Sequence, residues 1–469
     1  MAARQLESVD CSLQPLDFAF HPTKEILAAG LVDGTVEFHD YSIFSPSNSA
    51  RISDEDDDTI LSSIAVHSTD IPKLKSTRVG PTCRATVFNT SGDILYTASN
   101  GGSLAAIDVN RASHHSTSDN SILWKIDHAS PHGIHSLFHM TPAHIGECIV
   151  TGDDEGVIRI WDVRTCGNAS SSAPATAFDN CMSLPKGCIS SFHEHEDVIS
   201  SFQVDAECHT LLAASSDGVL SVFDLRKGGG DGKQAAIKSG PASKMEPVKL
   251  HPDTVQGPFR LHRRSDNQED ELLSMCLMKR GKKVVCGTHQ GVLNFWSWGT
   301  WGDISDRFPG HPLSIDALLK VDEDTLLTGS SDGVVRVLQI QPDQLLGVLG
   351  DHGGFPVEKL RFGTGKKVVG SLSHDSLIRL WSASIFSDDN DDDDDNDDND
   401  DDMGGMDSKE IASTVAAAAK KGGNDSEDDW EDASSDDSMD SDSDSDNDKM
   451  KNGKKGRFKT ENEDFFTDL

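Results

Sequence analysis

Five histidines lie close together in one part of the chain, and imidazole nitrogen is a common ligand of zinc and other transition metals. They are His128, His132, His135, His139 and His144. On a β-strand His135 and His139 would share one face, because side chains alternate along a strand. A metal site also needs groups that orient its imidazoles, and the neighbouring sequence does not supply them. We interpret this stretch as a His-rich loop and strand and predict no metal site.

The usual signatures of an active site are missing from the sequence. The segment GGGDGKQ (228–234) resembles a phosphate-binding loop, but it lacks Ser or Thr after Lys233 and no helical pattern follows it. We interpret it as a loop between repeats. No G-x-S-x-G, no H-E-x-x-H and no paired carboxylates stand out. The sequence therefore predicts no catalytic residue, no cofactor and no enzymatic activity.

Two short motifs have the chemistry of a protein-binding site. Trp161-Asp162-Val163-Arg164 and Phe223-Asp224-Leu225-Arg226 share the pattern W/F-D-x-R. Arginine has a planar, permanently charged guanidinium that can hold carboxylates or carbonyls of a partner. The alternative is that Arg164 and Arg226 only cap a strand end and pair with a local acid. Candidate binding residues are Trp161, Asp162, Arg164, Phe223, Asp224 and Arg226.

Both motifs belong to a pattern that recurs seven times along the chain. Each copy has a run of small β-forming residues, a polar residue, a tight turn, and a second run that ends near an aromatic residue and Asp. The copies are AAGLVDGTVEFHD (28–40), TASNGGSLAAID (97–108), TGDDEGVIRIWD (151–162), AASSDGVLSVFD (213–224), CGTHQGVLNFWS (286–297), TGSSDGVVRVLQ (328–339) and GSLSHDSLIRLWS (370–382). The turn residues are Gly34, Gly102, Gly156, Gly218, Gly291, Gly333 and Ser376.

Each copy predicts a β-hairpin, because glycine accepts the positive φ of a tight turn. Further runs such as DVISSFQV (197–204) and LLGVLG (345–350) flank the hairpins, which makes four strands per repeat. One such sheet cannot bury both faces alone, so the sheets are expected to stack in a ring. The last repeat has no fourth strand after 377–382, whereas residues 4–10 have no hairpin partner. We predict that the N-terminal strand completes blade 7 and closes the ring.

These repeats resemble the WD-repeat family, whose fold is a β-propeller. The best copy carries Trp161-Asp162, and His195, His311 and His352 match the histidines that open a blade. The resemblance implies that Asp33, Asp217 and Asp332 bond the blade-opening histidine and a neighbouring Ser or Thr. It also implies that W/F-D-x-R motifs in adjacent blades can dock on the damaged-DNA-binding adaptor of cullin-four ubiquitin ligases. Long loops are expected at 42–58, 110–120, 165–190 and 226–246.

Charge divides the chain of 469 residues into three parts. Of its net charge of −37, residues 1–386 carry −15, residues 387–448 carry −24, and residues 449–469 carry +2. An acidic body fits phosphate backbones poorly, so we expect no direct nucleic-acid binding by the propeller. No run of apolar residues is long enough to span a membrane, and nine cysteines without paired spacing indicate a reducing compartment.

The C-terminal region reads as a tail. Residues 387–448 are rich in Asp and Ser, and such composition predicts disorder. Serines beside acidic residues between 426 and 445 suit an acidophilic kinase. A basic cluster follows, which is either an address for an import receptor or a solvated patch that offsets the acid. The cluster consists of Lys449, Lys451, Lys454, Lys455, Arg457 and Lys459.

With its terminal FFTDL (465–469), the chain resembles the family of WD repeat-containing protein 55 and its fungal relative Jip-five. That resemblance implies a nuclear, largely nucleolar protein linked to ribosomal RNA maturation and ribosome assembly. Expected partners are ribosome-assembly factors or the ubiquitin-ligase adaptor, bound by a monomer within larger complexes. The expected domains are a seven-bladed all-β propeller (1–386), an acidic tail (387–448) and a basic terminal segment (449–469).

Overall fold

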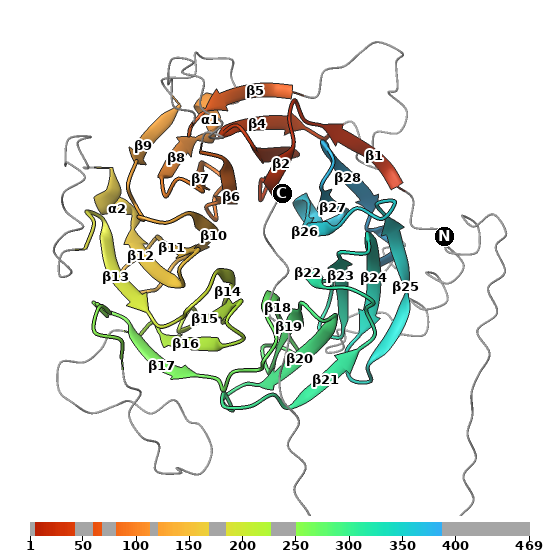
Figure 1. Ribbon diagram of the computed structural model, residues 1–469. Helices are drawn as coiled ribbons and strands as arrows, with labels where there is room; N and C mark the ends of the chain where they lie inside the picture. The colour runs from red at the N-terminus through yellow and green to blue at the C-terminus, as the bar shows by residue number, and fades with distance from the viewer. Residues whose placement is uncertain are drawn as a thin grey trace, which may run out of the picture. The chain divides into compact units, whose positions relative to one another are not determined.

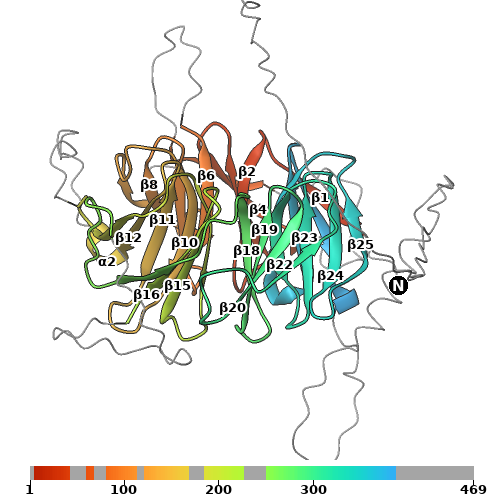
Figure 2. The ribbon, with the colours of Figure 1, turned by 60° about the horizontal axis from the view of Figure 1, so that its bottom comes forward.

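Seven four-stranded antiparallel sheets are arranged as blades around a ring (Figure 1). The computed structural model describes residues 5–42, 60–67, 81–112, 121–167, 184–226 and 250–386. Figure 2 shows the strands of neighbouring blades running from one face of the ring to the other. The predicted seven-bladed propeller is confirmed.

Every blade runs from an inner strand beside the central axis to an outer strand at the rim. Blade 1 consists of β2 (Pro15–Phe20), β3 (Ile26–Leu31), β4 (Thr35–Asp40) and β5 (Ile60–Ala65). Blade 2 consists of β6 (Cys83–Phe88), β7 (Ile94–Ser99), β8 (Leu104–Asp108) and β9 (Ile122–Ile126). Blade 3 consists of β10 (Ile134–Met140), β11 (Cys148–Asp153), β12 (Val157–Asp162) and β13 (Cys188–His193). Blade 4 consists of β14 (Ile199–Val204), β15 (Thr210–Ser215), β16 (Leu220–Asp224) and β17 (Arg260–Arg264). Blade 5 consists of β18 (Leu272–Met278), β19 (Lys283–Thr288), β20 (Val292–Ser297) and β21 (Asp306–Pro309). Blade 6 consists of β22 (Ile315–Lys320), β23 (Thr325–Ser330), β24 (Val334–Gln339) and β25 (Gln344–Asp351). Blade 7 consists of β26 (Val357–Phe362), β27 (Val368–Ser373), β28 (Leu377–Ser382) and β1 (Gln5–Asp10). Short helices α1 (Val109–Ala112) and α2 (Val163–Cys166) follow β8 and β12, and 3₁₀ turns cover Thr364–Lys366 and Ser384–Phe386.

The turn between the second and third strand of each blade explains the glycine pattern of the sequence. In blades 1 to 6 the turn glycine has φ between 74° and 88°, a conformation that side chains with a Cβ rarely adopt. Space is also limited, because a Cβ at Gly156 would lie 2.5 Å from the carbonyl oxygen of His195. Each turn therefore packs directly under the segment that leads into the next blade.

Apolar contacts between blades form the core. The second strands β11, β23 and β27 are buried at every position. Hydrophobic clusters combine residues of neighbouring blades, as when Ile160 of blade 3 packs in one cluster with Phe202 and Phe223 of blade 4. A single blade cannot bury either of its apolar faces without its neighbours, so the stability of each blade depends on the whole ring.

The N-terminal strand closes the ring, as predicted. β1 pairs antiparallel with β28, with Val9 opposite Ile378, and becomes the outer strand of blade 7. Val9 is fully buried and shares a cluster with Phe18 of blade 1 and Leu380 of blade 7. The two ends of the folded ring are thus held in one sheet.

At several junctions a residue after the outer strand of one blade links that blade to the next. His352 donates its backbone N–H to Gly333 O of blade 6 (2.8 Å), and its Nε2 lies 2.7 Å from Ser371 Oγ of blade 7. Trp381 Nε1 donates to the same hydroxyl at 2.7 Å. Burial lowers the pKa of His352 to about 4, so its ring is neutral near pH 7. We call such a residue a lock residue; others are His67 (to Gly34 and Thr97), Ser130 (to Gly102 and Asp153) and His311 (to Gly291 and Thr328).

The predicted Asp–His contacts form in one of three places. Asp217 Oδ2 lies 2.9 Å from His195 Nδ1, which confirms that contact. The prediction is wrong for Asp332, whose carboxylate is held by both terminal nitrogens of Arg336 at 2.6 and 3.1 Å. A charged guanidinium four residues away binds a carboxylate more strongly than a neutral imidazole does. Asp33 accepts a hydrogen bond from the backbone N–H of Thr35 instead, and the lock residue that enters its blade is a cysteine, Cys11.

Most of the predicted loops lie outside the described residues. For the loop expected at 165–190 the boundaries were too wide, because α2 covers Val163–Cys166 and β13 already begins at Cys188. The acidic tail and the basic terminal segment also lie outside the described residues. Within the described ranges, no helix has the length and apolar character needed to cross a membrane.

Deleting residues 1–10 should lower the melting temperature by several degrees. The deletion removes the β1–β28 ladder and the buried Val9 side chain, and it exposes β28 as an unpaired edge. Differential scanning calorimetry would measure the change. Deleting residues 1–4 alone, which spares β1, is the control and should leave the melting temperature close to that of the full chain. An unchanged melting curve for the longer deletion would contradict closure by β1.

Candidate functional site

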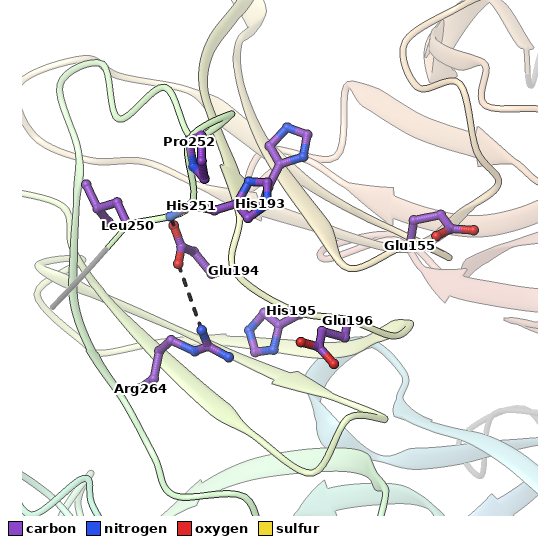
Figure 3. A pocket seen from close by; sticks show the side chains of 9 residues that line it. All are labelled: Glu155, His193, Glu194, His195, Glu196, Leu250, His251, Pro252 and Arg264. Atoms are coloured by element: carbon purple, nitrogen blue, oxygen red, sulfur yellow. Dashed lines mark hydrogen bonds and ion pairs between the residues drawn. The ribbon is translucent and has the colours of Figure 1, made fainter. Parts of the chain in front are cut away.

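A pocket of about 480 Å³ lies between blades 3 and 4 (Figure 3). It lies at the same end of the blades as the turn of blade 3, which contributes Glu155, and the segment that joins β13 to β14. The segment before β17 covers its outer side. Its lining residues are Glu155, His193, Glu194, His195, Glu196, Leu250, His251, Pro252 and Arg264.

Glu194 is the structural acid of this pocket. It is buried, and it accepts hydrogen bonds from His251 N (3.1 Å) and Thr254 Oγ1 (2.7 Å). Arg264 Nη1 lies 4.0 Å from its second oxygen (Figure 3). These contacts hold the segment 250–254 against β13. The carboxylate of Glu194 is therefore engaged in positioning the pocket wall.

His195 lines the pocket, and its contact with Asp217 links the two blades. The His195 Nδ1–Asp217 Oδ2 contact joins the segment after β13 to the turn of blade 4, and Glu196 N donates to the same oxygen at 3.2 Å. Burial tends to raise the pKa of Asp217, but the contact with His195 and the hydrogen bonds from the backbone N–H groups of Val219 and Glu196 together lower it. The Glu196 backbone is fixed in this way, while its side chain is exposed at the pocket mouth.

The pocket has an excess of negative charge. Three glutamates line it against a single arginine, Arg264. Burial lowers the pKa of His193, with a contribution from the positive charge of Arg159, so His193 is neutral near pH 7. Two of the carboxylates, those of Glu155 and Glu196, are on exposed residues. The arrangement suits a Lys or Arg side chain of a partner protein and disfavours an anion.

The sequence did not point to this pocket. Its residues come from three segments around 155, 193–196 and 250–264, and the folded ring brings them together. The sequence identifies His195 as a blade-opening histidine, a prediction that the His195–Asp217 contact confirms. The one signal of the pocket in the sequence is the density of Glu and His in HEHED (193–197), which is better explained by the blade-opening histidine than by a set of metal ligands.

The two W/F-D-x-R motifs occupy the same position in consecutive blades. Trp161 and Phe223 are fully buried on the third strands β12 and β16, and Trp161 Nε1 donates to Thr151 Oγ1 at 3.0 Å. Both aromatic side chains therefore belong to the hydrophobic core. Only the Asp and Arg of each motif reach the end of the strand, at the opposite end from the turn glycine.

Each arginine is bound to the aspartate of its own motif. Arg164 donates through Nε (2.9 Å) and Nη2 (2.7 Å) to the two oxygens of Asp162. Arg226 holds Asp224 in the same way, at 2.8 and 2.6 Å. The hydrogen bond from Arg164 is the main cause of the lowered pKa of Asp162. The side chain of Arg164 is 65% exposed and that of Arg226 is 35% exposed, so both remain reachable from solvent.

The His-rich stretch falls on blade 3. His135 and His139 are on the inner strand β10, and burial lowers the pKa of His135 to about 3. His139 stacks on Tyr96 with ring centroids 5.9 Å apart. A different group, Cys11, Glu37 and His39, places three possible metal-binding atoms within 4.8 Å of one another. The predicted address residues Lys449 to Lys459 lie outside the described residues.

Comparison with known proteins gives a consistent result. Residues 186–224 match the family described as WD domain, G-beta repeat. A protein of Arabidopsis thaliana named WD repeat-containing protein 55 is 30% identical over 375 residues, which are 80% of this chain and 82% of that protein. WD repeat-containing protein JIP5 of Cryptococcus neoformans is 30% identical over 380 residues, 81% of this chain and 82% of its own length. The mouse WD repeat-containing protein 55 is also 30% identical, over 77% of this chain and 72% of its own.

Proposed function

The chain belongs to the family of WD repeat-containing protein 55 and WD repeat-containing protein JIP5, and on that premise we propose that it is a non-enzymatic scaffold of the nucleolus. Its role would be to support ribosomal RNA maturation and ribosome assembly. A WD-repeat propeller favours this role because it is a rigid ring that presents loops for protein binding. The proposed partners are proteins, and the proposed compartment is the nucleus with its nucleolus.

The acidic pocket between blades 3 and 4 carries this proposal. Ribosomal proteins and many factors that accompany them are rich in Lys and Arg. The exposed carboxylates of Glu155 and Glu196 offer such side chains a place at the rim of a preformed pocket. The acidic run 387–448 would extend the same attraction to a basic partner. Both contributions should weaken with salt, because charges at exposed positions are screened within about 8 Å at physiological ionic strength.

Replacing Glu155 and Glu196 together by Gln should weaken the binding of basic partners several-fold. Each exposed ion pair contributes about 0.2–1 kcal/mol, so two of them together change the affinity by about twofold to thirtyfold. Glu194 is left intact because it holds the pocket wall. Affinity purification with quantitative mass spectrometry would compare the variant with the wild type.

The control for this pair is Glu207→Gln, an exposed glutamate between β14 and β15 that is outside the pocket. Basic ribosome-assembly factors should be depleted with the double variant and retained with the control. If the wild type enriches no ribosome-assembly factor, the proposed function is wrong. If it enriches them and the double variant does so equally, the pocket is not the binding site.

The basic cluster Lys449–Lys459 is proposed as the nuclear address, read by the acidic groove of an import receptor. Removing residues 387–469 should leave the melting temperature almost unchanged and should move a fluorescent fusion out of the nucleolus. A matched variant replaces the six basic residues by Gln and keeps the length of the tail. Continued nucleolar concentration of the truncated protein would place the address in the propeller.

A second function is favoured by the paired W/F-D-x-R motifs. The Asp162–Arg164 and Asp224–Arg226 contacts have the same geometry in neighbouring blades, so they form a repeated surface at one end of the strands. A partner that offers two suitably spaced carboxylates could bind both arginines. The alternative proposal is therefore a substrate receptor that docks on the damaged-DNA-binding adaptor of a cullin-four ubiquitin ligase.

Replacing Arg164 and Arg226 together by Ala should abolish co-purification with that adaptor. The fold should remain, because ion pairs at exposed positions contribute little to stability. Arg307→Ala, at an exposed position on β21, is the control and should leave any adaptor binding unchanged. If the wild type never co-purifies with the adaptor, the receptor proposal is wrong.

A further inference from the structure

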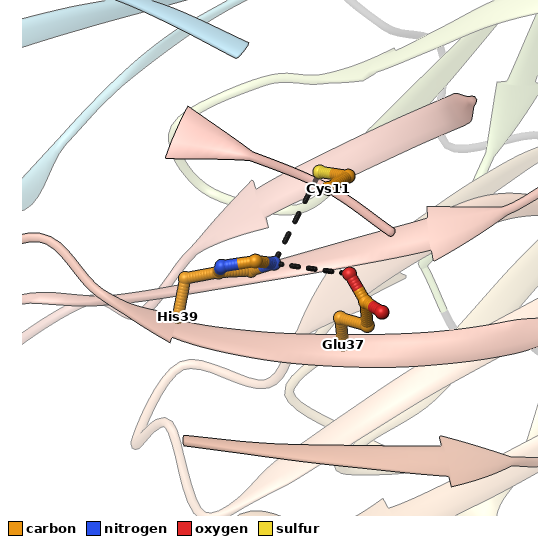
Figure 4. A group of neighbouring side chains, drawn as sticks. All are labelled: Cys11, Glu37 and His39. Carbon is orange, nitrogen blue, oxygen red and sulfur yellow. Dashed lines mark hydrogen bonds and ion pairs between the residues drawn. The ribbon is translucent and has the colours of Figure 1, made fainter. Parts of the chain in front are cut away.

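Cys11, Glu37 and His39 meet in the interior where the ring closes (Figure 4). Cys11 directly follows the closing strand β1, and Glu37 and His39 are two residues apart on the same face of β4 in blade 1. His39 Nε2 lies 3.4 Å from Glu37 Oε2 and 4.0 Å from Cys11 Sγ. All three residues are buried.

Cys11 occupies the position of a lock residue. Its backbone N–H donates to Ser376 O in the turn of blade 7 at 3.0 Å, as His352 donates to the turn glycine of blade 6. Its side chain then enters the following blade, as the side chain of His352 does. In the blades that His67, His311 and His352 enter, the side chain of the lock residue meets a Ser or Thr of the second strand.

Blade 1 cannot form that hydrogen-bonded lock. The strand register places Ala29 opposite Glu37, where blade 7 has Ser371 opposite Arg379. The same register places His39 opposite Leu27, where blade 7 has Trp381 opposite Val369. At the one junction where the chain closes on itself, the His, Ser, Arg and Trp of blade 7 are thus replaced by Cys, Ala, Glu and His.

Three of the replacing residues, Cys11, Glu37 and His39, have side chains of the kinds that bind zinc. Zinc accepts thiolate, imidazole and carboxylate together, at about 2.3 Å for sulfur and about 2.0–2.2 Å for nitrogen and oxygen. Tetrahedral geometry with these bond lengths separates the donor atoms by about 3.3–3.6 Å. The separations of 3.4 and 4.0 Å around His39 Nε2 are close to this and longer than a strong charge-assisted hydrogen bond of about 2.7–2.9 Å.

We propose that Cys11, Glu37 and His39 bind a Zn²⁺ ion that fastens the closing strand to blade 1. The thiol of Cys11 gives up its proton to solvent and becomes a thiolate. One thiolate and one carboxylate then balance the two positive charges of the ion, so the buried site is neutral overall. A sulfur donor disfavours Mg²⁺ and Ca²⁺, which prefer oxygen. With one donor atom from each side chain, the three residues fill three positions of a tetrahedral zinc ion and leave the fourth to a water molecule.

The position of the Glu37 carboxylate is fixed by its neighbours. Ser12 N donates to Glu37 Oε2 at 3.2 Å, and the same oxygen lies 3.4 Å from His39 Nε2.

The full chain, purified with any histidine tag removed, should contain about one zinc per molecule by inductively coupled plasma mass spectrometry. Cys11→Ser and His39→Gln should each lose most of it. Cys286→Ser is the matched control: that cysteine is equally buried, and it occupies the place where blade 7 has Ser371. A strong chelator should lower the melting temperature of the wild type and of the control by several degrees, and should leave that of Cys11→Ser unchanged.

The absorption spectrum of bound Co²⁺ provides a second measurement, and its main result comes from the wild type. Co²⁺ added to the metal-free wild type should give the near-ultraviolet absorption of a cobalt–thiolate bond, and the Cys286→Ser control should give the same band. The proposal is overturned if the wild type takes up neither zinc nor cobalt, or if Cys11→Ser keeps the zinc content of the wild type.

Discussion

A short four-stranded sheet has two apolar faces, and in this protein each face is covered only by the neighbouring sheet. Every other feature of the propeller depends on that constraint, because seven mutually covered sheets require a closed ring. The pairing of β1 with β28 satisfies it with the two ends of the folded region in one sheet. The pairing also buries Val9, which packs in one hydrophobic cluster with Phe18 of blade 1 and Leu380 of blade 7. In a ring closed in this way β28 is paired on both sides, and blade 7 has four strands like the other blades.

The links between blades explain why the repeats tolerate so much variation. Each lock residue is anchored by its backbone N–H, which any residue except proline provides. The side chain is therefore free to differ: histidine bonds a hydroxyl at Ser371, serine bonds a carboxylate at Asp153, and Cys11 faces Glu37 and His39. A blade whose lock residue differs from histidine, such as blade 1, keeps the architecture because the main chain carries the connection. The side-chain position then becomes available for other chemistry.

Sequence reasoning succeeded where a rule acts over a few residues. The turn glycines predicted the hairpins because positive φ is a local demand, and a missing fourth strand predicted β1 because strands in a blade are counted locally. It failed for Asp332, where Arg336 on the same hairpin outcompetes the expected histidine. The pocket joins Glu155 to Arg264, more than a hundred residues apart, and no spacing rule spans that distance. Cys11 and His39 acquire their meaning only from the strand register, which shows them in the places of His352 and Trp381.

The two candidate binding surfaces are at opposite ends of the same strands. β12 begins after Gly156, beside Glu155 and the acidic pocket, and ends at Asp162, whose carboxylate Arg164 holds. A strand of six residues spans about 20 Å, so a protein bound at one end leaves the other end accessible. The charges also differ, because the pocket has an excess of carboxylates while each guanidinium at the other end is paired with the aspartate of its own motif. A ring with an acidic site on one face and paired arginines on the other can hold two unlike partners at once, which is what a scaffold requires.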